Sequence, residues 1–145
     1  MIMQNLNPVV AYTAGVWDLF HIGHLNMLRR ASGHGDCLIV GVATDEAATA
    51  YKRKPVIPFE QRCAIVRAIR YVDMVVPVYE LGSVEPMIKY GVAVRVTGDD
   101  FGQYPEQKVA AIRMAELGIR LVTLYRTPFV STTLIRQRIG ETNED

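Results

Sequence analysis

Two histidines three positions apart, His21 and His24, lie in the segment Gly15–His24, which follows an apolar run and opens a helical pattern. The N-terminus of a helix attracts anions through its unpaired N–H groups and its dipole. Two imidazoles at such a turn can donate hydrogen bonds to a phosphate and stabilise charge that develops during in-line attack. Gly23 lacks a Cβ that would block a close phosphate. The segment therefore indicates nucleotide chemistry; the alternative is a helix-packing His24 beside a solvated His21.

Apolar runs and helical patterns alternate five times along the chain. The strand-like runs fall at about 9–14, 37–42, 74–78, 92–97 and 119–124, and the helical patterns at about 22–32, 59–71, 84–90, 105–117 and 132–139. Five βα repeats with almost continuously apolar strands predict an α/β fold: a single-domain, doubly wound, five-stranded parallel sheet of the Rossmann-like type. The predicted domain spans 1–145, with its core at about 9–140. Its ligand should bind at the carboxyl ends of the strands.

Two further segments follow predicted strands. Asp100, in Gly98-Asp99-Asp100, lies at the rim of the expected cleft, where a carboxylate could meet a ribose hydroxyl or Mg²⁺, although an Asp-rich turn is equally expected there. Arg126 opens a second segment, which also contains Thr127, Val130, Ser131, Thr132 and Thr133. Its hydroxyls provide an N-cap for the last helix. That helix start, with Arg126, could hold the β- and γ-phosphates opposite the histidines.

A basic loop joins the second strand to the next helix over 51–62. Its prolines prevent it from continuing as a helix, so it could close over phosphates. Next to an anion-binding turn, we expect phosphate contacts from Arg53, Arg62 and Arg70. The alternative is a solvated loop on an ordinary amphipathic helix.

Composition limits the classes of partner. The chain has 145 residues, half of them apolar, and a net charge of +1, which argues against general attraction to nucleic acid or to a membrane surface. Arg outnumbers Lys by 12 to 4, which suits fixed phosphate contacts. No signal peptide or transmembrane run is evident, and Cys37 and Cys63 lie in apolar patterns typical of buried thiols. We therefore expect a cytoplasmic protein.

Four ordered signatures resemble the cytidylyltransferase family of small nucleotidyltransferases, with the glycerol-3-phosphate enzymes as nearest members. They are GVWDLFHIGH at 15–24, RYVD at 70–73, GDD at 98–100 and RTPFVSTT at 126–133. The resemblance covers about residues 10–139. It implies that a phosphate monoester attacks the α-phosphorus of a nucleoside triphosphate, with Mg²⁺ assisting and pyrophosphate leaving. It also implies a homodimer.

Carried over residue by residue, the resemblance makes His21, His24 and Arg126 catalytic. It places around the nucleotide Gly15, Val16, Trp17, Gly23, Asp100, Arg126, Thr127, Val130, Ser131, Thr132 and Thr133. Arg62 and Arg70 match family arginines that bind phosphates. The metal ligands are not indicated.

Two departures from the family pattern bear on the substrate. Val16 replaces a usual Thr, and Pro128-Phe129 replace a usual Glu-Gly. CTP with a small phosphorylated alcohol, glycerol 3-phosphate first, is the favoured pair, giving a CDP-alcohol. An adenylyltransferase acting with ATP on a sugar phosphate or flavin mononucleotide is the alternative. A class I aminoacyl-tRNA synthetase is disfavoured by size. A non-catalytic nucleotide-sensing module is the candidate from another class, and it would release no pyrophosphate.

Overall fold

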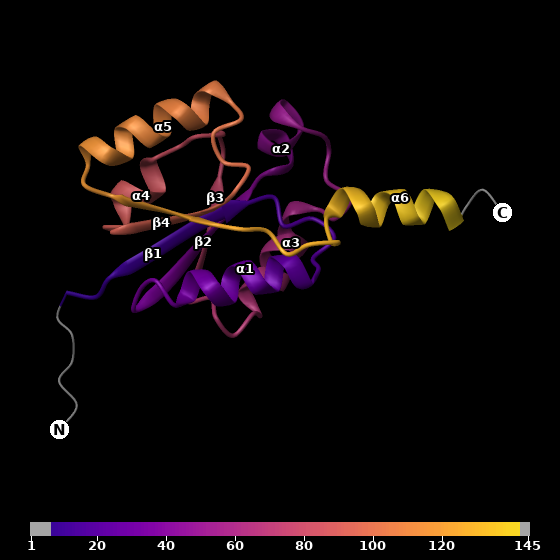
Figure 1. Ribbon diagram of the computed structural model, residues 1–145, viewed down its shortest axis with the longest axis horizontal. Helices are drawn as coiled ribbons and strands as arrows, with labels where there is room; N and C mark the ends of the chain where they lie inside the picture. Colours follow the sequence, from indigo (N-terminus) through magenta and orange to yellow (C-terminus); the bar gives the residue numbers. More distant parts are fainter. Residues whose placement is uncertain (1–6, 143–145) are drawn as a thin grey trace.

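A computed structural model describes residues 7–142 and shows one parallel sheet with helices on both faces (Figure 1). The predicted domain of 1–145 thus extends outside the described residues at both ends. The strand order is β3-β2-β1-β4-β5, which is the predicted doubly wound arrangement. The strands are β1 (Val10–Gly15), β2 (Cys37–Ala43), β3 (Met74–Val78), β4 (Val94–Gly98) and β5 (Arg120–Leu124).

Five of the six helices were predicted within a few residues of their ends. They are α1 (Ile22–Ser32), α3 (Phe59–Arg67), α4 (Glu85–Lys89), α5 (Pro105–Glu116) and α6 (Thr132–Thr142). The sixth, α2 (Asp45–Tyr51), lies where a loop was expected. The Thr44 side chain caps it by accepting from the Ala47 amide at 3.1 Å. Within the described residues, no helix combines the length and apolar character needed to cross a membrane.

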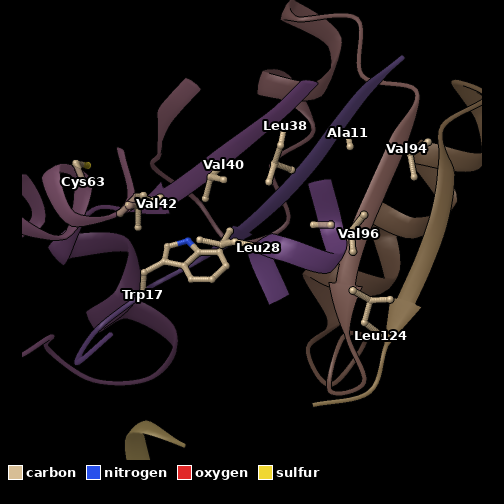
Figure 2. Close-up of a cluster of buried hydrophobic side chains, with 12 residues drawn as sticks. Ala11, Trp17, Leu28, Leu38, Val40, Val42, Cys63, Val94, Val96 and Leu124 are labelled. Atoms are coloured by element: carbon tan, nitrogen blue, oxygen red, sulfur yellow. The ribbon is translucent and has the colours of Figure 1, made fainter. Parts of the chain in front are cut away.

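Two apolar layers enclose the sheet because successive strand residues point to opposite faces. Ala11 packs into the layer under α1 and α3, whereas its neighbour Tyr12 packs under α4 and α5. Figure 2 shows the first layer, in which the strand residues Leu38, Val40, Val42, Val94 and Val96 meet Leu28 of α1 and Cys63 of α3. Because helices cover both faces of the sheet, the strands are apolar at nearly every position.

The sheet opens at the switch point between β1 and β4. These strands pair only at Ala11↔Val94 and Tyr12↔Arg95, whereas β1 and β2 pair over six positions. Beyond Tyr12 the two central strands are therefore no longer paired, although β1 continues to Gly15 and β4 to Gly98. The unpaired carboxyl ends leave a crevice, and the segments that follow β1, β4 and β5 surround it.

Candidate active site

The crevice contains three adjoining cavities, which we name by position. The wide cavity, of about 560 Å³, is lined by the histidine turn after β1 and by the segment after β5. The middle cavity, of about 280 Å³, shares His24, Lys52 and Asp100 with it. The inner cavity, of about 100 Å³, adjoins the middle one under α5. All residues predicted to be catalytic or to contact the nucleotide line the wide cavity. The two signature segments thus face one space.

The two imidazoles stack at the start of α1, with ring centroids 3.8 Å apart. Nδ1 of His21 accepts a hydrogen bond from the Gly23 amide at 3.0 Å, and Nδ1 of His24 accepts one from the His21 amide at 3.2 Å. In a neutral ring, an accepting Nδ1 leaves the proton on Nε2. Each histidine therefore carries an Nε2–H donor on the ring edge away from the backbone. Both residues cap the helix and also line the cavity.

Gly23 is required by the His21 ring. A Cβ at this position would lie 2.9 Å from Cε1 of His21 and 3.3 Å from a methyl group of Val130. Gly23 was predicted to leave room for a phosphate. In the structure, the group that a Cβ at this position would strike first is the imidazole of His21, which lies over the glycine. A side chain here would displace one of the two donors.

Both histidines are held in the neutral form. Burial lowers the pKa of His21, and burial together with the adjacent His21 lowers the pKa of His24 to about 3. Trp17 and Phe20 pack against the His24 ring at centroid distances of 5.4 and 5.2 Å. At neutral pH the pair is thus a set of neutral hydrogen-bond donors.

The depressed pKa of His24 predicts an acid-sensitive stability. An unfolded His24 takes up a proton below its ordinary pKa of 6.5, whereas the folded one does so only near 3. As the pH falls from about 6.5 towards 3, the unfolded state binds the extra proton, and stability should fall by up to about 1.4 kcal/mol per pH unit from this group. Urea unfolding between pH 7 and 4.5 should show a shallower loss in His24→Asn than in the wild type. Parallel curves would contradict this assignment.

Asp18 ties the histidine turn to two other segments. Its carboxylate accepts hydrogen bonds from the amides of Val56 and Ile57 at 2.8 and 2.9 Å, and from Arg136 of α6 at 3.0 Å. Burial raises the pKa of Asp18, but these hydrogen bonds outweigh burial and leave the pKa below its ordinary value. The Thr132 hydroxyl also donates to the Asp18 carbonyl. Asp18 therefore holds the basic loop and α6 at the mouth of the crevice.

The segment after β5 presents its hydroxyl groups at the start of α6. Ser131 caps this helix, as predicted, since its hydroxyl accepts from the Leu134 amide at 3.0 Å. Arg126 forms an ion pair of 2.9 Å with Asp99 on the neighbouring segment. The hydrogen bond from Arg126 lowers the pKa of Asp99. The ion pair fixes Arg126 at the rim of the wide cavity.

Phe129 occupies the left-handed backbone region, with a φ of 64°, and its side chain is 91% exposed. A non-glycine residue there costs about 1–2 kcal/mol, and the exposed ring returns no packing energy. Phe129→Gly should therefore stabilise the protein by about 1 kcal/mol after the entropy of glycine is subtracted. Thermal unfolding should show a Tm higher by roughly 2–4 °C. Phe129→Ala removes the ring but keeps the strain, so an equal rise in that variant would contradict this explanation.

Arg62 was predicted to contact a phosphate, and the structure places it elsewhere. Its side chain is fully buried. The guanidinium donates to the carbonyls of Val16, Ala43 and Ile57 at 2.7–2.8 Å, and pairs with Asp45 at 2.7 Å. With its donors taken by these groups, Arg62 joins the histidine turn, β2 and the basic loop from beneath. The correction is that Arg62 supports the site without facing it.

The other two arginines predicted to contact phosphate, Arg53 and Arg70, lie in different parts of the structure. Arg70 lies between α3 and β3, at the amino end of the sheet, where it is exposed and donates to the Tyr71 hydroxyl. It is therefore remote from the crevice, and the expectation for Arg70 is corrected as well. Arg53 lines the middle cavity and donates to the Thr133 hydroxyl at 3.3 Å. The basic loop thus does reach the start of α6.

Three cations in the middle cavity were missed from the sequence: Lys52, Arg95 and Arg136. Lys52 belongs to the basic loop that was singled out, so only its individual role was overlooked. Arg136 lies four residues after Thr132, one helical turn further along α6, which was a usable signal. Arg95 lies inside an apolar strand pattern, and a charged residue in such a pattern was itself a signal.

The described side chains alone do not form a metal site. Within the part of the chain that the structure describes, no group of three or more His, Cys, Asp or Glu side chains could hold a metal ion. Asp99 is paired with Arg126, whereas Asp100 lines both the wide and the middle cavity. Mg²⁺ commonly uses one or two carboxylates together with substrate phosphates. The donor set fits a metal that arrives with a triphosphate, but not a protein-only site.

Comparison with known proteins identifies the family. A model described as "Cytidylyltransferase-like" matches residues 12–138. The chain belongs to the cytidylyltransferase-like family. The predicted resemblance and enzyme class, a nucleotidyltransferase, are thereby confirmed.

Relatives within this family differ in the substrates that their names state. Glycerol-3-phosphate cytidylyltransferase of Staphylococcus aureus is 37% identical over 88% of this chain and 92% of its own length. Ethanolamine-phosphate cytidylyltransferase of Arabidopsis thaliana is 34% identical over 95% of this chain, which spans only 34% of that protein. FAD synthase of Methanocella arvoryzae is 36% identical over 89% of this chain and 94% of its own length.

A solved structure supports the fold. The lipopolysaccharide core biosynthesis protein of Thermoplasma volcanium superposes with a TM-score of 0.71 over 86% of this chain and all of that chain, at 22% identity. At this identity the likeness concerns the fold, and it agrees with the predicted Rossmann-like sheet.

Proposed function

We propose that the protein transfers a cytidylyl group from CTP to a small phosphate monoester, with glycerol 3-phosphate as the leading candidate, and releases pyrophosphate. The observation that carries this proposal is the shared wall of two cavities. His24, Lys52 and Asp100 line both the wide cavity, which suits a triphosphate, and the middle cavity, which suits an acceptor. A reaction between two bound substrates needs such a boundary.

The wide cavity has the features that a nucleoside triphosphate requires. Neutral Nε2–H donors at His21 and His24, the start of α6 and the Arg126 guanidinium are all directed by hydrogen bonds or ion pairs of their own. Such preorganised donors stabilise charge on a transferring phosphate without reorganising during the reaction. We place the α-phosphate beside the two histidines and the β- and γ-phosphates towards Arg126 and α6.

The middle cavity has the charge that a phosphate monoester requires. Lys52, Arg53 and Arg136 line it, and Lys52 also reaches the boundary with the wide cavity. These cations would position the acceptor phosphate, whose oxygen attacks the α-phosphorus from the side opposite the departing pyrophosphate. The attacking oxygen forms the new P–O bond as the bond to the pyrophosphate breaks. No proton has to leave a phosphate dianion, so the site needs no general base.

Mg²⁺ is part of this proposal as a cofactor bound with the triphosphate. When bound, it would neutralise charge on the β- and γ-phosphates as pyrophosphate leaves. Asp100 is the carboxylate best placed to meet it, since it lines both cavities. The predicted homodimer and cytoplasmic location stay predictions.

A second candidate, adenylyl transfer from ATP to flavin mononucleotide, is favoured by the similarity to an FAD synthase. The middle cavity argues for the first candidate. It is small, and its cationic and hydroxyl-bearing walls include Lys52, Arg95 and Tyr104. A tricyclic flavin ring would need an extended apolar slot, whereas a short polyol phosphate matches these walls.

A pyrophosphate-release screen tests the proposal. CTP, ATP, GTP and UTP are each combined with Mg²⁺ and with glycerol 3-phosphate, ethanolamine phosphate, 3-phosphoglycerate or flavin mononucleotide. We expect release with CTP and a small phosphate monoester. Release only with ATP and flavin mononucleotide would establish the second candidate. Triphosphate binding without release under any combination would indicate the sensing module.

A further inference from the structure

Arg95 is a charged residue on the floor of the crevice. It forms the last pair between β4 and β1, opposite Tyr12, at the point where the two strands part. Its guanidinium lies over the ring of Tyr12 at 5.0 Å and near that of Phe101 at 5.8 Å. The Nε atom is buried without a hydrogen-bond partner. Among the ion pairs of residues 7–142, none includes Arg95.

The cavities place Arg95 at the far end of the middle cavity from the histidines. His24 lines the wide and middle cavities, whereas Arg95 lines the middle and inner ones. Tyr51, Phe101 and Gln107 accompany Arg95 in both. A molecule in the middle cavity whose phosphate lies near His24 therefore extends its other end towards Arg95. The adjoining inner cavity, of about 100 Å³, offers room for a few atoms beside the guanidinium.

A half-buried guanidinium without an anionic partner is a costly arrangement. The two aromatic rings offset part of this cost through cation–π attraction, and the Tyr12 hydroxyl accepts a hydrogen bond from the guanidinium, but the Nε–H group stays unpaired. An anion at this point would supply both charge and acceptors. Among small anions, a carboxylate matches the planar fork of arginine with two parallel hydrogen bonds.

We infer that Arg95 determines acceptor specificity by binding a carboxylate on the tail of the substrate, which makes the acceptor a phosphorylated hydroxy acid. This inference rests on the proposed function, and it replaces the leading acceptor named there, glycerol 3-phosphate, with another small phosphate monoester that carries a carboxylate. The same charge repels an acceptor with an ammonium tail, such as ethanolamine phosphate, and gives no charge-based advantage to the neutral tail of glycerol 3-phosphate. Arg95 contacts the substrate remote from the reacting atoms, so its effect should depend on which acceptor is used.

The test compares 3-phosphoglycerate with glycerol 3-phosphate, which differ in having a carboxylate or a hydroxymethyl group at the tail. In the wild type, kcat/KM should be at least tenfold higher for 3-phosphoglycerate, and ethanolamine phosphate should be the poorest acceptor. Arg95→Met should lower kcat/KM for 3-phosphoglycerate by roughly 10- to 100-fold, through the loss of a charge-assisted hydrogen-bonded pair, and change that for glycerol 3-phosphate less than threefold. Arg95→Lys keeps the charge but not the planar fork of donors. Its kcat/KM for 3-phosphoglycerate should lie between those of the wild type and of Arg95→Met.

Gln107→Glu provides a second variant that preserves the fold. The Gln107 side-chain oxygen accepts hydrogen bonds from the amides of Gly102 and Tyr104, and a glutamate can accept both. It places a negative charge in the wall shared with Arg95, so it should lower the preference for 3-phosphoglycerate. Arg113→Met, which removes an exposed arginine of α5, is the matched control and should change neither acceptor. Tm and CTP affinity verify that each variant folds.

The outcomes separate this inference from the proposed function. Pyrophosphate release with equal or lower kcat/KM for 3-phosphoglycerate in the wild type, or a preference that survives Arg95→Met, overturns the role of Arg95 and leaves cytidylyl transfer intact. If no acceptor supports release, the proposed function fails. In that case, calorimetric binding of the two acceptors still tests the carboxylate site. Tighter binding of 3-phosphoglycerate that is lost in Arg95→Met supports the site, and equal binding of the two acceptors overturns it.

Discussion

Replacement of His24 by alanine should lower kcat by about 10²-fold or more and leave the KM for CTP within a fewfold of the wild-type value. The lost Nε2–H donor acts on charge that develops in the transition state, and removing one such donor typically costs about 3 kcal/mol. His21→Ala should behave similarly, since its ring stacks on His24 and lines the same cavity. Steady-state kinetics with CTP and the acceptor found by the screen measure both effects.

Two controls separate catalysis from folding at this position. His24→Asn keeps a side-chain oxygen that can accept from the His21 amide, so it preserves the helix cap but lacks a donor at the position of Nε2. Its kcat should fall nearly as far as that of the alanine variant, with a smaller loss of Tm because the helix cap is kept. His34→Ala, at the other end of α1, should retain full activity. Wild-type turnover in both His21→Ala and His24→Ala would remove the imidazoles from the mechanism.

Replacement of Arg62 by methionine should destabilise the protein by about 3–5 kcal/mol. The change leaves the buried carbonyl of Ala43 and the part-buried carbonyls of Val16 and Ile57 without their donor, and it removes the partner of Asp45. For a chain of this length, the loss corresponds to a fall in Tm of roughly 10 °C. Urea unfolding followed by circular dichroism measures the change in free energy.

The control for Arg62 lies on the same helix. Arg67 is exposed on α3, and Arg67→Met should change the free energy of unfolding by no more than about 0.5 kcal/mol. Arg62→Lys, which keeps the charge but fewer donors, should be intermediate. A direct phosphate contact would instead raise KM at an unchanged Tm, and that pattern in Arg62→Met would contradict the supporting role described above.

Most of the fold was predictable because the apolar pattern is strong. Strands buried on both faces appear as short continuous apolar runs, and the order of strands and helices then leaves few topologies. Helix α2 was missed because it has only seven residues, so its periodicity is weak. The Thr44-Asp45-Glu46 sequence nevertheless carries an N-cap and an acidic first turn, which are recognisable start signals.

The parts of the candidate site formed by a motif after a strand were predictable. The positions of individual charged side chains were less so. The histidine turn and the segment after β5 come together because both follow carboxyl ends of parallel strands in one sheet, on either side of β4. Arg62 was misassigned from its charge, its place beside the anion-binding turn and its match to family arginines. Its spacing of four from the buried Val66 nevertheless places it on the inward face of α3. Arg70 precedes β3, and a residue before a parallel strand lies at the end of the sheet away from the ligand.

The most direct test of nucleotidyl transfer follows labelled phosphorus from CTP. The protein is incubated with Mg²⁺, the acceptor that supports pyrophosphate release, and CTP labelled with ³²P at either the α- or the γ-position. Attack at the α-phosphorus predicts that the α-label appears in the acceptor product and the γ-label in pyrophosphate. Transfer of the γ-label to the acceptor, with the α-label left in CDP, would contradict the assignment of the histidine pair to the α-phosphate.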